Sequence, residues 1–261
     1  MNRLDALFKK KQKNILSLFF TAGYPDLQST AEIIRAAEEA GADMIEAGMP
    51  FSDPVADGKT IQHSSEEALK NGINMNLYFE QVREGGKSIQ QPVLFMGYFN
   101  QVLQYGPEKF CHACNDAGID GFIIPDLPPD IFIREYRDIF HGAGLRSVFL
   151  ITPDTTEERI HQLDDLATGF LYMVSSRSIT GSRESFDASQ EEYFKRVSSM
   201  NLKNPLIAGF GISNHATFAT ACQYAAGAIA GSGYIKALEK SRDIRVTTRE
   251  FVTSLLSPEH I

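Results

Sequence analysis

Two carboxylates lie in one segment whose residue types suit proton transfer. Glu46 follows the short apolar pair at residues 44–45, and Asp57 comes eleven residues later, beyond a loop that contains Pro50 and Pro54. A carboxylate at the end of a buried strand is a poor structural choice, because burying an unpaired charge is costly. Two carboxylates in one partly dry pocket can hold different pKa values and divide the roles of general acid and general base. The alternative is that Glu46 is a buried ion-pair partner and Asp57 only a turn residue.

Glycine-rich segments later in the chain could supply backbone N–H donors to an anion. They are residues 179–181, 209–213 and 230–233, and the last two follow short apolar runs and contain neither Lys nor Arg. Phosphate is often bound by such donors at the C-terminal ends of barrel strands, where glycine allows close approach and a helix N-terminus adds a favourable dipole. Because glycines also serve ordinary turns, the predicted phosphate site depends on both loops together.

The segment from residue 175 to residue 190 is rich in Ser, Gly, Asp and Arg and follows an apolar run. A long loop at a strand end suits a mobile lid that excludes water when it closes. A solvated surface loop is the alternative. We interpret the segment as a lid, because structureless loops of this length in a compact barrel are more often functional.

Eight short apolar runs could form the strands that position these groups. They lack the polar alternation of a half-solvated sheet, which favours buried parallel strands. The runs are residues 18–20, 44–45, 93–96, 122–124, 148–151, 170–174, 206–208 and 228–230.

Helical patterns separate the runs and carry their own boundary signals. Ser29 with Glu32, and Thr155 with Glu158, have the spacing of a capping box at a helix start. Ala-Gly pairs precede four of the runs, and glycine there can take the left-handed conformation that ends a helix; the pairs are at 40–41, 117–118, 143–144 and 226–227.

Alternating helices and strands predict parallel βα units. We therefore expect residues 1–261 to form a single (β/α)₈ barrel domain with a short N-terminal helix, in which Leu4, Leu7 and Phe8 share one face. A doubly wound open sheet is the alternative, because periodicity does not separate the two.

Composition excludes several classes of function. The chain has 261 residues, 43% of them hydrophobic and 22% charged, which is close to the globular average. A net charge of −8 argues against nucleic-acid and anionic-membrane partners, and no apolar run approaches the roughly 20 residues of a membrane span. Three cysteines indicate a reducing compartment, and we expect the cytoplasm. Cys111 and Cys114 lack a second pair and the histidines lack ligand spacing, so no metal site is expected.

Several long motifs occur along the chain, at residues 19–25, 46–58, 61–62, 96–100, 125–128, 169–172, 180–181, 209–213 and 231–232. Together and in this order, they closely resemble the alpha subunits of tryptophan synthase. The resemblance implies a (β/α)₈ barrel lyase. Its reaction is the retro-aldol cleavage of indole-3-glycerol phosphate to indole and glyceraldehyde 3-phosphate, a step of L-tryptophan biosynthesis.

The resemblance also implies roles for individual residues. Glu46 would be the acid/base that protonates indole C3 and takes the proton of the glycerol hydroxyl. Asp57 would accept the indole N–H and stabilise the developing positive charge, and Tyr172 would line the site near Glu46. The pocket would include Phe19, Tyr98, Thr180 and Phe210, and the phosphate would be held by Gly181, Gly211, Gly231 and Ser232.

A partner is implied as well: a beta subunit that carries pyridoxal phosphate and receives indole through a tunnel in an αββα heterotetramer. This chain itself would need no cofactor. Residues at positions that resemble the subunit interface are Asp53, Pro54, Asp126 and Pro128. The lid departs from the family's usual Gly-Val-Thr-Gly, because Ser178 stands in place of the first glycine. Less backbone freedom there bears on the rate of lid closure more than on the chemistry.

Two other classes of function compete with the lyase. A different phosphate-binding barrel, such as a sugar-phosphate isomerase or epimerase, would share the glycine loops without needing Glu46 and Asp57 together. A regulatory subunit would bind the partner and contribute little catalysis. The intact pair of carboxylates argues against the second class.

Overall fold

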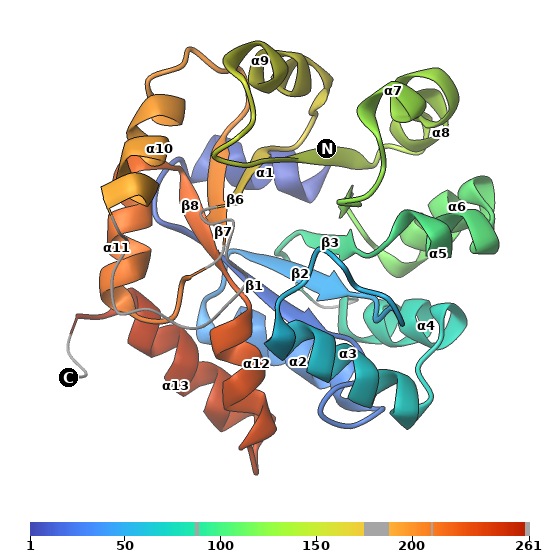
Figure 1. Cartoon of the computed structure of the whole chain (residues 1–261). Coiled ribbons are helices and arrows are strands. Elements are labelled where there is room, and N and C mark those ends of the chain that lie inside the picture. The colour runs from blue at the N-terminus through green and yellow to red at the C-terminus, as the bar shows by residue number, and fades with distance from the viewer. Residues whose placement is uncertain (87–88, 175–187, 210, 259–261) are drawn as a thin grey trace.

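A closed barrel of parallel strands forms the centre of the computed structural model, which describes residues 1–86, 89–174, 188–209 and 211–258 (Figure 1). Each strand pairs with the next along the chain, and the last pairs with the first through the register Ile15↔Gly227. The strands are β1 (Ile15–Thr21), β2 (Met44–Gly48), β3 (Val93–Met96), β4 (Gly121–Ile123), β5 (Arg146–Ile151), β6 (Leu171–Val174), β7 (Leu206–Gly209) and β8 (Gly227–Ala230). The predicted barrel is confirmed, and the open-sheet alternative is wrong.

Each of the eight apolar runs lies at a strand, because a strand covered on both faces needs apolar side chains on both. The main difference is in β1, which begins at Ile15 and ends at Thr21, so that it also contains Ser17. Ser17 and Thr21, the polar residues of this strand, are both buried. Their hydroxyl groups therefore need partners inside the protein.

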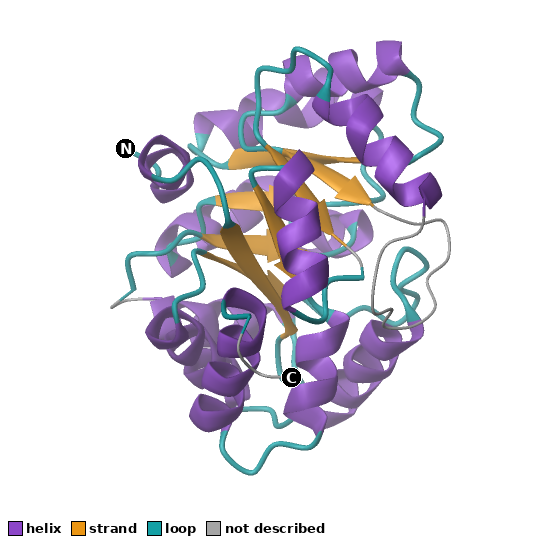
Figure 2. Ribbon diagram, turned by 90° about the vertical axis from the view of Figure 1, so that its left-hand side faces the viewer, coloured by secondary structure: helices purple, strands orange, loops and turns teal. Residues whose placement is uncertain are grey.

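Helices enclose the strands on the outside (Figure 2). Those of the first half are α1 (Arg3–Lys10), α2 (Ser29–Ala40), α3 (Lys59–Asn71), α4 (Met75–Gly86), α5 (Phe99–Tyr105), α6 (Pro107–Ala117), α7 (Pro129–Ile131), the π-helix η1 (Phe132–Tyr136) and α8 (Arg137–Gly142). The rest are α9 (Glu157–Leu166), α10 (Ala188–Ser198), α11 (His215–Tyr224), α12 (Ser232–Glu239) and α13 (Ile244–Leu256).

Helix α1 packs at the end of the barrel where the strands begin. Leu4 is fully buried, and Arg3 forms an ion pair of 2.8 Å with Asp120, directly before β4. Asp5 forms a second one of 2.7 Å with Arg146, the first residue of β5. With its starting end covered by α1, the barrel offers its C-terminal end for a site.

Helix starts differ from the predicted capping boxes by about one residue. Helix α2 already includes Ser29, whose hydroxyl instead accepts the N–H of Asp26 at 3.3 Å. Helix α9 is capped by Thr156, while the Thr155 hydroxyl accepts the N–H of Thr152 at 2.9 Å. In both places a local turn uses the hydroxyl that the spacing assigned to the helix.

Three of the four Ala-Gly glycines act as predicted. Gly41, Gly118 and Gly144 have φ values of 94°, 74° and 80°. Gly227 is different, because it is the first residue of β8 and its φ is not positive. An added Cβ there would lie 2.1 Å from the carbonyl oxygen of Ile15 on β1. Gly227 is therefore required by the close approach of two backbones at the seam that closes the barrel.

Gly227→Ala is expected to lower the free energy of unfolding by about 3 kcal/mol, at the upper end of usual overpacking costs, because the clash is with backbone that cannot turn away. Urea denaturation monitored by circular dichroism measures the change. Gly142→Ala is the matched control, since no atom lies within 4 Å of its added Cβ. Equal stability of the two variants would contradict this account of the seam.

Candidate active site

Glu46 lies on β2 inside the barrel, paired in register with Phe19 of β1 and Leu94 of β3. Its side chain is fully buried, and the hydroxyl of Ser17 donates a hydrogen bond of 2.7 Å to Oε1. Its second oxygen, Oε2, has no hydrogen-bond partner among the described residues. Burial raises the pKa of Glu46 to about 8, and the Ser17 hydrogen bond opposes part of that rise. The group therefore holds its proton at neutral pH and can donate it.

The alternative of a buried ion pair does not fit this geometry. Within the part of the chain that the structure describes, no cationic side chain pairs with Glu46, and its one hydrogen bond comes from a neutral hydroxyl. A carboxyl group retained without a charge partner in a barrel interior costs stability. The position of Glu46 therefore favours a catalytic role over a structural one.

Asp57 lies in the loop between β2 and α3 and is 8% exposed. The hydroxyl of Tyr98 donates a 2.8 Å hydrogen bond to its Oδ2 and accepts the N–H of Ala56 at 3.0 Å. Burial raises the pKa of Asp57 to about 6, against the lowering effect of the Tyr98 hydrogen bond. At neutral pH Asp57 is therefore mainly ionised, whereas Glu46 is mainly protonated. The two carboxyl groups therefore differ in charge at neutral pH, so that Glu46 can donate a proton while Asp57 supplies a negative charge.

Tyr98 has a polar role in addition to the apolar wall that the resemblance implies. Its ring stacks on Phe51, with centroids 5.0 Å apart and planes at 27°. Its hydroxyl joins the Asp57 loop to the end of β3 through the two hydrogen bonds above. One residue therefore supplies an aromatic surface and fixes the neighbouring carboxylate.

A pocket opens beside Asp57 and Tyr98 at the C-terminal end of the barrel. Its walls are mainly apolar, and Asp57 is the carboxylate among them; they comprise Phe19, Thr21, Gly48, Met49, Pro50, Phe51, Asp57, Ile61, Ser65, Met96, Gly97, Tyr98 and Pro125. Glu46 precedes Gly48 by two strand residues and so lies one layer deeper in the barrel. The apolar lining with one carboxylate suits an apolar ligand with a polar edge.

Tyr172 on β6 shares the barrel interior with both carboxylates. Its ring packs over Gly209, where an added Cβ would lie 2.2 Å from a ring carbon. Burial raises the pKa of the Tyr172 hydroxyl well above its usual value, and negative charge on Glu46 and Asp57 raises it further. Tyr172 is therefore a neutral hydroxyl under physiological conditions, near the two acidic groups as predicted.

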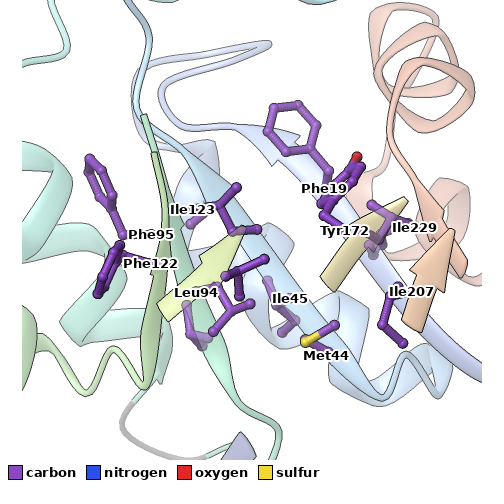
Figure 3. Close-up of a cluster of buried hydrophobic side chains, with 14 of the residues drawn as sticks. Phe19, Met44, Ile45, Leu94, Phe95, Phe122, Ile123, Tyr172, Ile207 and Ile229 are labelled. Atoms are coloured by element: carbon purple, nitrogen blue, oxygen red, sulfur yellow. The ribbon is translucent and has the colours of Figure 1, made fainter. Parts of the chain in front are cut away.

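Phe19 lies between the two halves of the site. A Cβ on Gly48 would lie 2.7 Å from its ring, and one on Gly231 would lie 3.2 Å away. Figure 3 draws Phe19 and Tyr172 in one cluster of buried side chains contributed by the strands. Phe19 therefore contacts both the pocket near Asp57 and the glycine loop after β8.

The two predicted phosphate loops come together. Gly211 follows β7 with a φ of 80°, and Gly231 precedes α12, which begins at Ser232. A Cβ on Gly233 would lie 3.6 Å from Cα of Ser213, so the loops after β7 and β8 are neighbours. This arrangement places glycine backbone beside a helix N-terminus, as an anion site requires.

Part of the predicted site lies outside the described residues. Thr180, Gly181 and Phe210 belong to this part, as does the predicted lid over residues 175–187. The last three residues assigned to the lid, 188–190, are instead the first turn of α10.

The residues predicted to meet a partner lie on the surface at the loops after β2 and β4. Asp53 is exposed beside the half-buried Pro54, and both line a surface groove that also includes residues of α3. Asp126 and Pro128 are exposed after β4, and the Asp126 carboxylate accepts the N–H of Phe99 at 2.8 Å. These positions are accessible to a second protein.

Sequence reasoning missed polar residues that support the site. Besides Ser17, the hydroxyls of Thr21 and Ser64 form a buried hydrogen bond of 2.7 Å beside the pocket. Ser17, Phe19 and Thr21 alternate along β1 and so face the same side of the strand. That alternation within an apolar strand is the signal that could have identified Ser17.

Neither metal-binding clusters nor membrane-spanning helices occur in the described ranges of the chain. No group of three or more His, Cys, Asp or Glu side chains there could hold a metal ion. No helix there is long and apolar enough to cross a membrane. Cys111 and Cys114 are buried on α6 as free thiols.

The raised pKa of Glu46 predicts how stability depends on pH. A carboxyl group whose pKa is higher in the folded state stabilises the fold fully below its unfolded value, here 4.5, and loses that contribution as the pH rises through about 8. Relative to Glu46→Gln, the unmodified protein should lose several kcal/mol of unfolding free energy over this range. Urea titrations of both proteins from pH 5 to pH 9 measure the difference. A difference independent of pH would contradict the burial of an ionisable group at this position.

Comparisons with known proteins point to one family. The sequence model described as "Tryptophan synthase alpha chain" matches residues 6–257. The tryptophan synthase alpha chain of Flavobacterium psychrophilum is 54% identical over 241 residues, covering 92% of this chain and 95% of the relative. That of Flavobacterium johnsoniae is 52% identical over 252 residues, covering 97% and 98%.

Solved structures agree with the sequence comparisons. A mutant tryptophan synthase alpha-subunit from Pyrococcus furiosus is 35% identical, with a TM-score of 0.86 and coverage of 94% of this chain and 99% of that one. The aminoacrylate-bound form of tryptophan synthase from M. tuberculosis is 29% identical, with a TM-score of 0.85 and 98% coverage of both chains. With its barrel, its two buried carboxyl groups and these relatives, the chain belongs to the tryptophan synthase alpha chain family.

Proposed function

We propose that this site cleaves indole-3-glycerol phosphate into indole and glyceraldehyde 3-phosphate, as the lyase of the alpha reaction in L-tryptophan biosynthesis. The observation that carries the proposal is the pair of buried carboxyl groups with different pKa values: Asp57, with a pKa of about 6, lines the apolar pocket, and Glu46, with a pKa of about 8, lies one layer deeper in the barrel. This pair separates a proton donor from a fixed negative charge at neutral pH.

In this proposal the indole ring binds among the apolar walls, with its N–H toward the Asp57 carboxylate. Neutral Glu46 donates its proton to indole C3, and the positive charge that develops in the ring is stabilised by ionised Asp57. Glu46, now a carboxylate, takes the proton of the hydroxyl on the adjacent side-chain carbon. The bond from C3 to the side chain breaks, its electron pair returns to the ring, and an aldehyde forms. Glu46 ends the cycle protonated, as it began.

The phosphate end of the substrate is assigned to the neighbouring loops after β7 and β8. Gly211, Gly231 and Ser232 supply the described part of this phosphate site, and Gly181 completes it in the proposal. Thr180 and Phe210 are assigned to the substrate pocket. Phe19 contacts Gly231 on one side and Gly48 on the other, so a substrate that spans both halves passes its ring. Tyr172 forms the wall beside Glu46.

The proposed partner is a tryptophan synthase beta subunit, which would dock on Asp53, Pro54, Asp126 and Pro128 in an αββα heterotetramer. Asp53, Asp126 and Pro128 are exposed at the loops after β2 and β4, which supports this assignment. Proton transfer by Glu46 and charge stabilisation by Asp57 account for the cleavage with this chain's own side chains, so pyridoxal phosphate belongs to the partner in this proposal. We assign the protein to the cytoplasm, where this biosynthesis and its reducing environment suit three free buried thiols.

The test is turnover of indole-3-glycerol phosphate by the purified chain, alone and with a beta subunit from a relative, with Glu46→Gln as the control. Cleavage that depends on Glu46 and rises with the partner supports the proposal. Binding of the substrate without cleavage in either condition would favour a regulatory subunit. No binding, together with turnover of a sugar phosphate, would favour a barrel isomerase or epimerase.

A further inference from the structure

Ser17 is a buried hydroxyl in a strand that is otherwise mainly apolar. It lies in the middle of β1, is fully buried, and its register partners are Met44 on β2 and Ile229 on β8. Neither neighbour offers a polar side chain, so the 2.7 Å hydrogen bond to Glu46 Oε1 satisfies its hydroxyl. An apolar residue of similar size would fill this position without a buried polar group.

The two oxygens of Glu46 are therefore not equivalent. Oε1 accepts the Ser17 hydrogen bond, whereas Oε2 is buried with no partner among the described residues. With Oε1 accepting the Ser17 hydroxyl, the proton of neutral Glu46 is assigned to Oε2. Geometry thus distinguishes the atom that is held from the atom that is free to react.

We propose that Ser17 is a positioning residue that holds Oε1 of Glu46 and thereby makes Oε2 the atom that gives and takes the proton. This inference rests on the function proposed above, because it specifies how its acid/base is oriented. Ser17 is fully buried and its hydroxyl is bonded to Oε1 of Glu46, so it acts through Glu46 and not through contact with the substrate.

Two properties of Glu46 should depend on this hydrogen bond. The first is orientation: without the Ser17 hydroxyl both oxygens lack a partner, and the carboxyl group can rotate away from the productive arrangement. The second is acidity, because a donated hydrogen bond favours the carboxylate and lowers the pKa. The neighbouring strands β1 and β3 carry no charged side chains that could shift the pKa of Glu46. The titratable neighbour is Tyr172 of β6.

Ser17→Ala tests both properties. We expect kcat to fall about tenfold, with KM and the affinity for glycerol phosphate nearly unchanged, because substrate contacts are retained. The limb of the pH–kcat profile that reports Glu46 should move to higher pH by about half to one unit, the size of one neutral hydrogen bond. Ser17→Thr retains a hydroxyl on a β-branched side chain suited to a strand, so its kcat and its Glu46 limb should match those of the unmodified protein. Ser17→Cys carries a weaker donor of similar size, so both values should lie between those of Ser17→Ala and the unmodified protein.

Infrared spectroscopy gives a readout that does not need turnover. The carbonyl stretch of the protonated Glu46 carboxyl is assigned by its loss in Glu46→Gln. In Ser17→Ala this band should move to higher frequency and should titrate at higher pH. If both the band and the pH profile match those of the unmodified protein, Ser17 only fills space and the inference is wrong. If Glu46→Gln is fully active, the proposed function fails instead, while the infrared titration still decides whether Ser17 holds the carboxyl group.

Discussion

Glu46→Gln is expected to lower turnover of indole-3-glycerol phosphate by about 10³- to 10⁴-fold, the upper range for loss of a general acid/base, because one group serves both proton transfers. Glutamine has nearly the same shape, and as a neutral group it suits a fully buried site at least as well as a carboxyl group does. The fold and the affinity for glycerol phosphate should therefore be retained. Steady-state kinetics with saturating beta subunit, together with circular dichroism, measures the separation.

Glu84→Gln is the matched control for this experiment. Glu84 lies on the surface of α4, where its carboxylate pairs with Arg35 at 3.7 Å, far from the strand ends that form the pocket. The same chemical change there should leave turnover unaltered. Turnover of Glu46→Gln within tenfold of the unmodified protein would remove Glu46 from the mechanism.

Asp57→Asn is expected to lower kcat by about 10²-fold, a magnitude typical of losing one electrostatic contact to a charged transition state. The amide oxygen can still accept the Tyr98 hydrogen bond and the indole N–H, but it carries no negative charge to stabilise the protonated ring. Affinity for an unreactive indole ligand should therefore change much less than kcat. A kcat equal to that of the unmodified protein would contradict the role of Asp57.

The pH dependence separates the charge of Asp57 from its position. Because ionised Asp57 is required and its pKa is raised to about 6, activity should fall as the pH drops through that value. Tyr98→Phe retains the charge, the ring and the Phe51 stack but removes the hydroxyl that lowers this pKa. As the pH falls, this variant should lose activity at a higher pH than the unmodified protein does, and its kcat should come closest to that of the unmodified protein between the pKa values of Asp57 and Glu46.

Much of the barrel could be predicted because strands covered on both faces require unbroken apolar runs, and these are visible in the sequence. Helix starts were less predictable. Ser29 and Thr155 have the right residue types at the right spacing, yet each hydroxyl serves a local turn. Gly227 illustrates a further limit: its role depends on the carbonyl of Ile15, which approaches it only when the barrel closes.

The site was predictable where chemistry concentrates in one segment, as it does for Glu46 and Asp57. It was not predictable where function depends on register. Ser17 is an ordinary serine until pairing of β1 with β2 places it within 2.7 Å of Glu46. Tyr98 was expected only as an aromatic wall, because the hydrogen bond to Asp57 depends on how the intervening loop returns to the end of β3.

The seam between β1 and β8 also bears on how the protein is made. The N–H of Ile15 donates to the carbonyl of Ala226 at 3.1 Å, and the rest of β1 pairs on that side with β8. On the ribosome β1 is synthesised long before its neighbour, so one of its edges stays without a native partner until nearly the whole chain has been translated. An unpaired edge strand is a template for intermolecular pairing. The nascent chain therefore depends on shielding of β1, by other segments or by chaperones, until the last strand arrives.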